Sequence, residues 1–171
     1  MNGDGVVTSR DQVDLGHTSS PFTFGVNLTL KYKNFTLFIL GNGQYGAKAM
    51  KNNSYYYMQG DNKYSVNARG RWTPETANTA THPRLTTLSS NNNAVASTFW
   101  LYSTDRFNLR KVQLTYDFPK EMWEGKVVKA LSIYLNGNDL LTISKNRDIM
   151  ETSVGYAPQT RFYNLGVKVT L

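Results

Sequence analysis

The sequence predicts an all-β fold made of antiparallel strands, each with one apolar and one polar face. From Phe22 to Tyr32, apolar and polar side chains alternate without interruption over eleven residues. The same alternation returns from Tyr163 to Leu171, at the end of the chain. Aromatic residues make up 13% of the chain, and they favour half-buried pleated surfaces. No stretch approaches the roughly 18 apolar residues that a transmembrane helix needs.

The first strand is expected to span Phe22–Tyr32 and to turn back at once. Lys33 and Asn34 have the composition of a tight turn. Alternation resumes over Phe35–Ile39, which is therefore predicted to be the returning strand. Together these segments form a β-hairpin.

Four further strands are predicted in the second half of the chain. Thr98–Phe107 is the first, and Lys111–Phe118 alternates until Pro119, which cannot donate to a strand ladder. Leu131–Asn136 and Tyr163–Leu171 are the last two, and the chain stops on an apolar face. The total is six strands.

The segment from about residue 41 to 97 differs from the rest, because it is polar and rich in Asn, Tyr and Gly. A connection of this length in a compact domain indicates either function or disorder. Membrane barrels place their long loops on the extracellular side. We therefore predict an extracellular loop here, with one extra strand pair near Tyr55–Met58.

Alternation alone fits either a transmembrane β-barrel or a soluble β-sandwich. Eleven residues is the length of a tilted membrane strand. The polar side of the first strand carries Thr, Gly, Asn and Lys, which suit a wet lumen, while Phe22 and Tyr32 bracket its apolar side like an interfacial girdle. Two alternatives remain: a complete eight-stranded barrel serving as an anchor or adhesin, and a β-sandwich that binds carbohydrate.

Composition narrows the possible functions. The chain has no Cys, which excludes disulfides, thiol nucleophiles and Cys-based metal sites. Its net charge of +7 would attract polyanions, but the basic residues are scattered and no nucleic-acid motif occurs, so nucleic acid is not expected as a partner. No nucleophile elbow is present, and His17 and His82 lack a catalytic partner. No catalytic residue is assigned, and the chain is not expected to be an enzyme.

The chain begins Met1-Asn2-Gly3-Asp4-Gly5, without the basic and apolar regions of a secretion signal. A barrel must be exported to reach an outer membrane. We therefore expect either a removed leader or a longer parent chain.

Several segments resemble, in order, the end of SusC/RagA-type TonB-linked outer-membrane transporters. Arg71-Trp72-Thr73-Pro74-Glu75 is the most distinctive of them. The others are the Asp-rich opening Asn2–Val7 with Asp11, the hairpin Lys31–Phe35, Pro83–Arg84, Asn108–Tyr116 with Pro119, Asn136–Thr142 and Tyr163–Val167. The resemblance extends over nearly the whole chain.

This resemblance implies that residues 1–171 are the C-terminal portion of a 22-stranded barrel with an N-terminal plug. It implies import of oligosaccharides or peptides across a bacterial outer membrane, with energy delivered by TonB through the plug that this chain lacks. A SusD-like lipoprotein would act as the lid, and outer-membrane lipid would surround the wall. Such barrels usually end in Phe; this chain ends in Leu171, which keeps the apolar face.

Polar strand positions are expected to face the lumen and to wet the channel rather than to recognise cargo. They are Thr23, Asn27, Lys31, Lys111, Gln113, Lys168 and Thr170.

The opening loop has the ligand spacing of an EF-hand-like calcium loop whose first position is missing. Oxygen ligands at alternate positions suit a hard cation, so calcium is the candidate cofactor. A Gly-rich turn without metal is the alternative. The candidate ligands are Asn2, Asp4, the Val6 carbonyl, Thr8 and Asp11.

Tyr55, Tyr56 and Tyr57 are candidate contacts for a ligand or a lid, since their rings could stack on sugar faces. The alternative is that they pack the loop against itself. Trp72 is expected to be structural, because Pro74 restrains the residue before it to an extended conformation.

Overall fold

The computed structural model describes residues 3–5, 8–58, 60–61, 65–88, 92–123, 127–152 and 154–171. The chain divides into two compact units. The first, here called the loop unit, comprises Met1–Ser19 and Lys48–Ser103, and the second, the sheet unit, comprises Ser20–Ala47 and Thr104–Leu171. No helix in the described ranges is long and apolar enough to cross a membrane.

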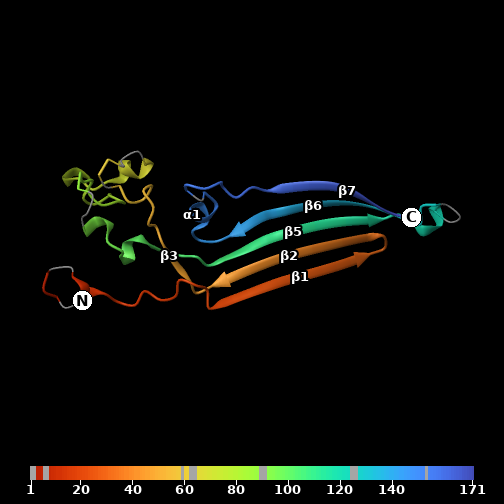
Figure 1. Cartoon of the computed structure of the whole chain (residues 1–171), viewed down its shortest axis with the longest axis horizontal. Coiled ribbons are helices and arrows are strands. Elements are labelled where there is room, and N and C mark those ends of the chain that lie inside the picture. The colour runs from red at the N-terminus through yellow and green to blue at the C-terminus, as the bar shows by residue number, and fades with distance from the viewer. Residues whose placement is uncertain are drawn as a thin grey trace. The chain divides into compact units, whose positions relative to one another are not determined.

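The sheet unit consists of five antiparallel strands that lie side by side (Figure 1). Their spatial order is β1, β2, β5, β6, β7, and β1 and β7 are the open edges. The strands are β1 (Phe22–Tyr32), β2 (Phe35–Tyr45), β5 (Arg106–Asp117), β6 (Ala130–Ile143) and β7 (Phe162–Thr170). The predicted all-β antiparallel fold is therefore confirmed, as an open sheet.

The β1–β2 hairpin has the predicted turn at Lys33 and Asn34, with Lys33 at a φ of 51°. The returning strand continues to Tyr45, well past the predicted end at Ile39. Residues 41–45, expected to begin the loop, are thus part of the wall. This extension was not predicted because Gly41 and Gly43 interrupt the alternating pattern. Glycine is needed at both positions, since a Cβ at Gly41 would collide with the ring of Phe107 and a Cβ at Gly43 with the ring of Phe24.

Two strand predictions are wrong. Thr98–Phe107 is not one strand: it is a 3-10 helix, then β4 (Leu101–Ser103), then the start of β5. The predicted strand pair near Tyr55–Met58 is a turn, in which the Asn53 side chain accepts a hydrogen bond from the Tyr55 backbone N–H at 3.1 Å. The extra pair lies elsewhere, because β3 (Lys48–Met50) pairs with β4. The described part of the chain therefore has seven strands, whereas six strands and one extra pair were predicted.

The connections of the sheet differ in length at its two ends. Residues 33–34 and 118–129 connect strands at one end, while 46–105 and 144–161 connect them at the other. The 118–129 connection contains a 3-10 helix, Lys120–Met122, and the 144–161 connection contains α1 (Arg147–Thr152). Short turns on one side and long loops on the other are typical of outer-membrane barrels.

The loop unit is held together by an aromatic cluster around Trp100, which is only 3% exposed. Its ring lies 4.8 Å from Tyr57 and 4.7 Å from Phe99, and its Nε1 donates a hydrogen bond to the Asn93 carbonyl at 3.0 Å. Besides β3 and β4, this unit contains the 3-10 helices Ser9–Asp11, Val66–Gly70, Pro74–Thr76, Asn92–Ala94 and Thr98–Trp100.

Candidate functional site

The strand register divides the five-stranded sheet into two chemically different faces. Directly paired residues of antiparallel strands point to the same face. Asn27 pairs with Leu40, Leu40 with Lys111, and Lys111 with Asn138, which defines one row across four strands. Extending the register gives the polar face, which carries Thr23, Asn27, Thr29 and Lys31 of β1; Thr36, Asn42 and Gln44 of β2; Arg106, Asn108, Lys111, Gln113, Thr115 and Asp117 of β5; Ser132, Asn136, Asn138 and Thr142 of β6; and Asn164, Lys168 and Thr170 of β7.

All seven residues predicted to face a lumen lie on this polar face. The period-two alternation of each strand was enough to predict that these residues share a face. The face also includes Phe38 and Leu40, because β2 is apolar on both sides in its middle, and the aromatic residues Tyr134 of β6 and Phe162 of β7. That this face borders an aqueous lumen remains a prediction.

The opposite, apolar face is exposed along its length. Leu28, Leu135 and Val167 are 43%, 55% and 62% exposed, and they come from three different strands. Soluble monomers rarely leave so large a continuous apolar surface in water. The sheet therefore needs an apolar neighbour on this face.

A β-bulge at Arg110 keeps the apolar side chains of β5 on one face and its polar side chains on the other, on both sides of the bulge. Leu109 pairs with Gly41, while Lys111 pairs with Leu40, so Arg110 is an extra residue. Its guanidinium donates to the Asn42 side chain at 3.0 Å and forms an ion pair with Asp139 at 2.7 Å. The bulge was not predicted. Its only signal is the three-residue spacing between the apolar residues Leu109 and Val112.

Side-chain amides form a hydrogen-bonded ladder on the polar face. The Asn136 Oδ1 accepts from Nδ2 of Asn138 at 3.1 Å and from Nδ2 of Asn164 at 3.0 Å. The Asn108 Oδ1 accepts from the Thr142 hydroxyl at 3.1 Å, and both residues are buried. These bonds fix the side chains of three neighbouring strands in place.

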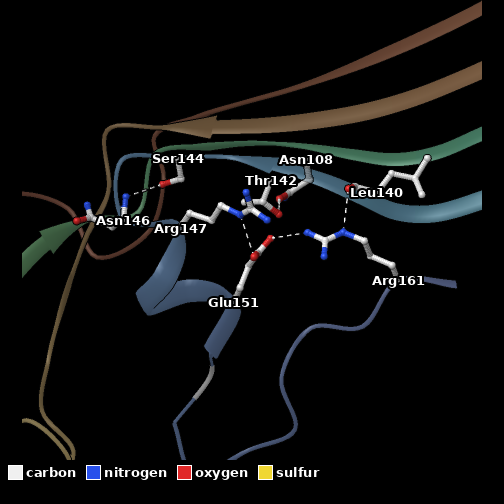
Figure 2. Close-up of polar contacts among 8 residues, drawn as sticks. All are labelled: Asn108, Leu140, Thr142, Ser144, Asn146, Arg147, Glu151 and Arg161. Carbon is white, nitrogen blue, oxygen red and sulfur yellow. Dashed lines mark hydrogen bonds and ion pairs between the residues drawn. The ribbon is translucent and has the colours of Figure 1, made fainter. Parts of the chain in front are cut away.

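At the end of the sheet with the long connections, charged and polar side chains link the connection 144–161 within itself and to the strands (Figure 2). Glu151 lies between two arginines, with its carboxylate 2.8 Å from Arg147 and 3.5 Å from Arg161. Arg161 Nε also donates to the Leu140 carbonyl at 2.9 Å, and the Ser144 hydroxyl donates to the Asp105 carbonyl at 2.7 Å. Because the arginines are partly exposed, each ion pair adds little stability. The main effect of these contacts is to hold the connection between β6 and β7 in place.

The three candidate tyrosines occupy one turn of the loop unit. Tyr57 packs on Trp100, whereas Tyr55 and Tyr56 pack edge to face on each other at 5.1 Å. Tyr56, Tyr57, Trp100 and Arg84 help to line a cavity of about 20 Å³, which is close to the size of one water molecule. Such a cavity does not hold a sugar ring. Contact of these tyrosines with a ligand or lid therefore remains a prediction for their exposed edges.

The motif around Trp72 forms a tight local structure. Thr73 is extended, at φ −139° and ψ 166°, and caps the 3-10 helix that starts at Pro74. The Trp72 backbone N–H donates to the His82 carbonyl at 2.9 Å. The extended conformation predicted before Pro74 is thus present. Trp72 itself is 40% exposed.

Burial, and next the Lys51 charge, lower the pKa of His82. The unfolded chain therefore takes up this proton more readily than the folded one. The contribution of neutral His82 to stability is complete above the ordinary histidine pKa of about 6.5 and is lost as the pH falls below it.

The predicted calcium ligands lie at the start of the loop unit. Asn2 and Val6 are outside the described residues. Thr8 and Asp11 hold each other, because the Asp11 carboxylate accepts from the Thr8 backbone N–H at 2.9 Å and both side chains cap the 3-10 helix Ser9–Asp11. Within the described ranges, no three His, Asp or Glu side chains are grouped closely enough to hold a metal ion.

Calcium binding by this loop stays a prediction. In a chain extended upstream to supply a ligand before Asn2, a calorimetric titration should show calcium binding that Asp4→Asn weakens. The absence of heat on adding calcium would contradict it, and the same titration with magnesium tests selectivity.

Comparison with known proteins extends these observations. No family model matches the chain. TonB-dependent receptor P26 of Formosa agariphila is 29% identical over 148 residues, covering 85% of this chain and 15% of the receptor. TonB-dependent receptor P3 of the same organism is 21% identical over 144 residues, covering 84% of this chain and 14% of the receptor. The chain therefore spans about one seventh of the length of these relatives.

Solved structures agree with this relationship. The RagAB peptide importer in its open-open state superposes with a TM-score of 0.70 at 20% identity, over 100% of this chain and 20% of that chain. A structure of the RagAB peptide transporter gives 0.62 at 22% identity, over 76% and 14%. This chain is a relative of TonB-dependent receptors. The resemblance to SusC/RagA-type receptors carried by its sequence motifs is thereby confirmed, and its open sheet has the fold of part of such a barrel.

This family relationship allows the two faces of the sheet to be compared with the wall of an outer-membrane barrel. The relatives are receptors and transporters rather than enzymes, which agrees with the lack of an assigned catalytic residue. In an outer-membrane barrel wall, one face meets lipid and the other an interior that is polar. The exposed apolar face and the amide-rich polar face of this sheet match that division.

Proposed function

We propose that this chain forms part of the wall of an outer-membrane, TonB-dependent transporter that imports oligosaccharides or peptides. The observation that carries the proposal is the division of all five strands into an exposed apolar face and a predominantly polar face. Lipid would cover the apolar face, and the polar face would border the channel.

The open edges support a role as one part of a larger wall. β1 and β7 each leave one side unpaired, and a barrel spans a membrane only when every strand edge is paired. Further strands of the same barrel would complete these edges. A soluble sandwich would instead need a second sheet over the apolar face. Apart from the five-stranded sheet, the described residues form only β3 and β4, two three-residue strands of the loop unit.

Partners follow from the family. A SusD-like lipoprotein would cover the extracellular end, where the long connections 46–105 and 144–161 emerge. TonB would act through a plug domain outside this chain. The structures of RagAB, a peptide importer, support a two-protein assembly, and peptides are accordingly one of the two proposed cargo classes.

Fractionation of bacteria that express the protein tests its location. The protein should sediment with the outer membrane on a sucrose gradient and should resist extraction with alkaline carbonate. A periplasmic protein of similar size serves as the control for trapped soluble material. Recovery of the folded protein in the soluble fraction would contradict the proposal, because an exposed apolar face of this size is not stable in water.

A further inference from the structure

We propose that the polar face selects anionic oligosaccharides, because its positive charges outnumber its negative ones. This inference rests on the proposed transport function and adds the charge of the cargo. It concerns Lys31, Lys111, Lys168 and Arg106, which lie on three strands of the polar face.

Each of these four cations lacks a partner within the described part of the chain. None of them forms an ion pair or a side-chain hydrogen bond there. The register places one carboxylate on the same face, that of Asp117, which accepts a hydrogen bond from the Ser132 hydroxyl at 2.6 Å and keeps its negative charge. The four cations therefore outnumber it. Asp139, beside the bulge, forms an ion pair with the Arg110 guanidinium at 2.7 Å.

The cations are distributed along the whole face rather than gathered in one spot. Arg106 lies at the end with the long connections, and Lys111 lies near the middle of the sheet. Lys31 pairs with Thr36 and Lys168 with Ser132, close to the end with the short turns. A passage with an excess of one sign of charge and bounded by low-dielectric walls concentrates ions of the opposite sign along its length. An anionic cargo would therefore meet a cation at each stage of its passage.

The rest of the polar face favours a saccharide over a peptide. Asn27, Asn164 and Gln113 offer amides that both donate and accept, which suits sugar hydroxyls that do the same. Phe38, Tyr134 and Phe162 add aromatic rings to this face, and such rings can stack on the faces of sugars. The cargo class is thus an oligosaccharide that carries carboxylate or sulfate groups.

The test compares dextran sulfate with neutral dextran of the same length, binding to the protein in a zwitterionic detergent. Dextran sulfate should bind, and the triple substitution Lys31→Gln, Lys111→Gln, Lys168→Gln should weaken binding about tenfold. The matched control, Lys33→Gln, Lys120→Gln, Lys145→Gln, removes the same charge away from the polar face and should keep the affinity. Replacing the first three lysines by Arg should also keep it, and circular dichroism verifies that each variant is folded.

Three results would overturn the inference. They are equal affinity for neutral and sulfated dextran, an equal loss in the control triple, and tighter binding of poly-glutamate than of dextran sulfate at equal charge. The proposed transport function would survive all of them, because it depends on membrane location and not on the charge of the cargo.

Discussion

Replacing Leu28 by Arg should prevent stable insertion of the sheet into a membrane. Leu28 lies at the middle of β1 on the apolar face and is 43% exposed. If lipid covers this face, an Arg near the bilayer midplane costs about 2–4 kcal/mol. The expected result is a fall in the outer-membrane fraction, accompanied by degradation or aggregation of the remainder.

Thr29→Arg is the matched control for this experiment. Thr29 is the next residue along the same strand and points to the polar face, where it pairs with Phe38. An added cation there meets the proposed aqueous lumen and should leave membrane insertion nearly unchanged. Equal damage by both substitutions would show that the two faces do not have different surroundings, and would contradict the barrel.

Replacing Trp100 by Ala should unfold the loop unit. The substitution removes ring contacts with Tyr57 and Phe99 and the hydrogen bond to the Asn93 carbonyl. Loss of a buried Trp costs about 3–5 kcal/mol. Amide hydrogen exchange in residues 48–103 should accelerate by a factor of about 100 or more, while strands β5 and β6 keep their protection.

Trp72→Ala provides the comparison, because Trp72 is 40% exposed and the backbone bond to His82 does not need its side chain. It should change exchange in the loop unit only slightly. If Trp100→Ala also left exchange unchanged, the cluster would not be the core of this unit.

The sequence was sufficient to predict a strand and its two faces wherever apolar and polar residues alternate without interruption. β1 has the predicted bounds, and the polar residues of β1, β5 and β7 share one face because a strand has a period of two. The far half of β2 was missed, since Gly41 and Gly43 carry no side chain to continue the pattern. Their role depends on Phe24 and Phe107, which lie on neighbouring strands.

Features that depend on contacts between distant residues could not be predicted. β3 and β4 pair across a separation of about fifty residues, and each has only three residues, too few for a periodic signal. Trp100 lay inside a pattern that resembled a strand, but its burial with Tyr57 requires the chain to turn at that point. The ion pair between Asp139 and Arg110 likewise depends on the partner strand. The excess of positive charge on the polar face became visible only with the strand register.

The bulge at Arg110 has a consequence for how such a wall can change in evolution. In a strand with a period of two, loss of one residue turns every following side chain to the opposite face. Arg110 is the exception in β5: without it, Leu109 and Lys111 would still point to opposite faces, as they do now. A residue can therefore be lost here while the polar and apolar side chains of β5 keep their own faces. A one-residue gap elsewhere in the strand would require a second, compensating change.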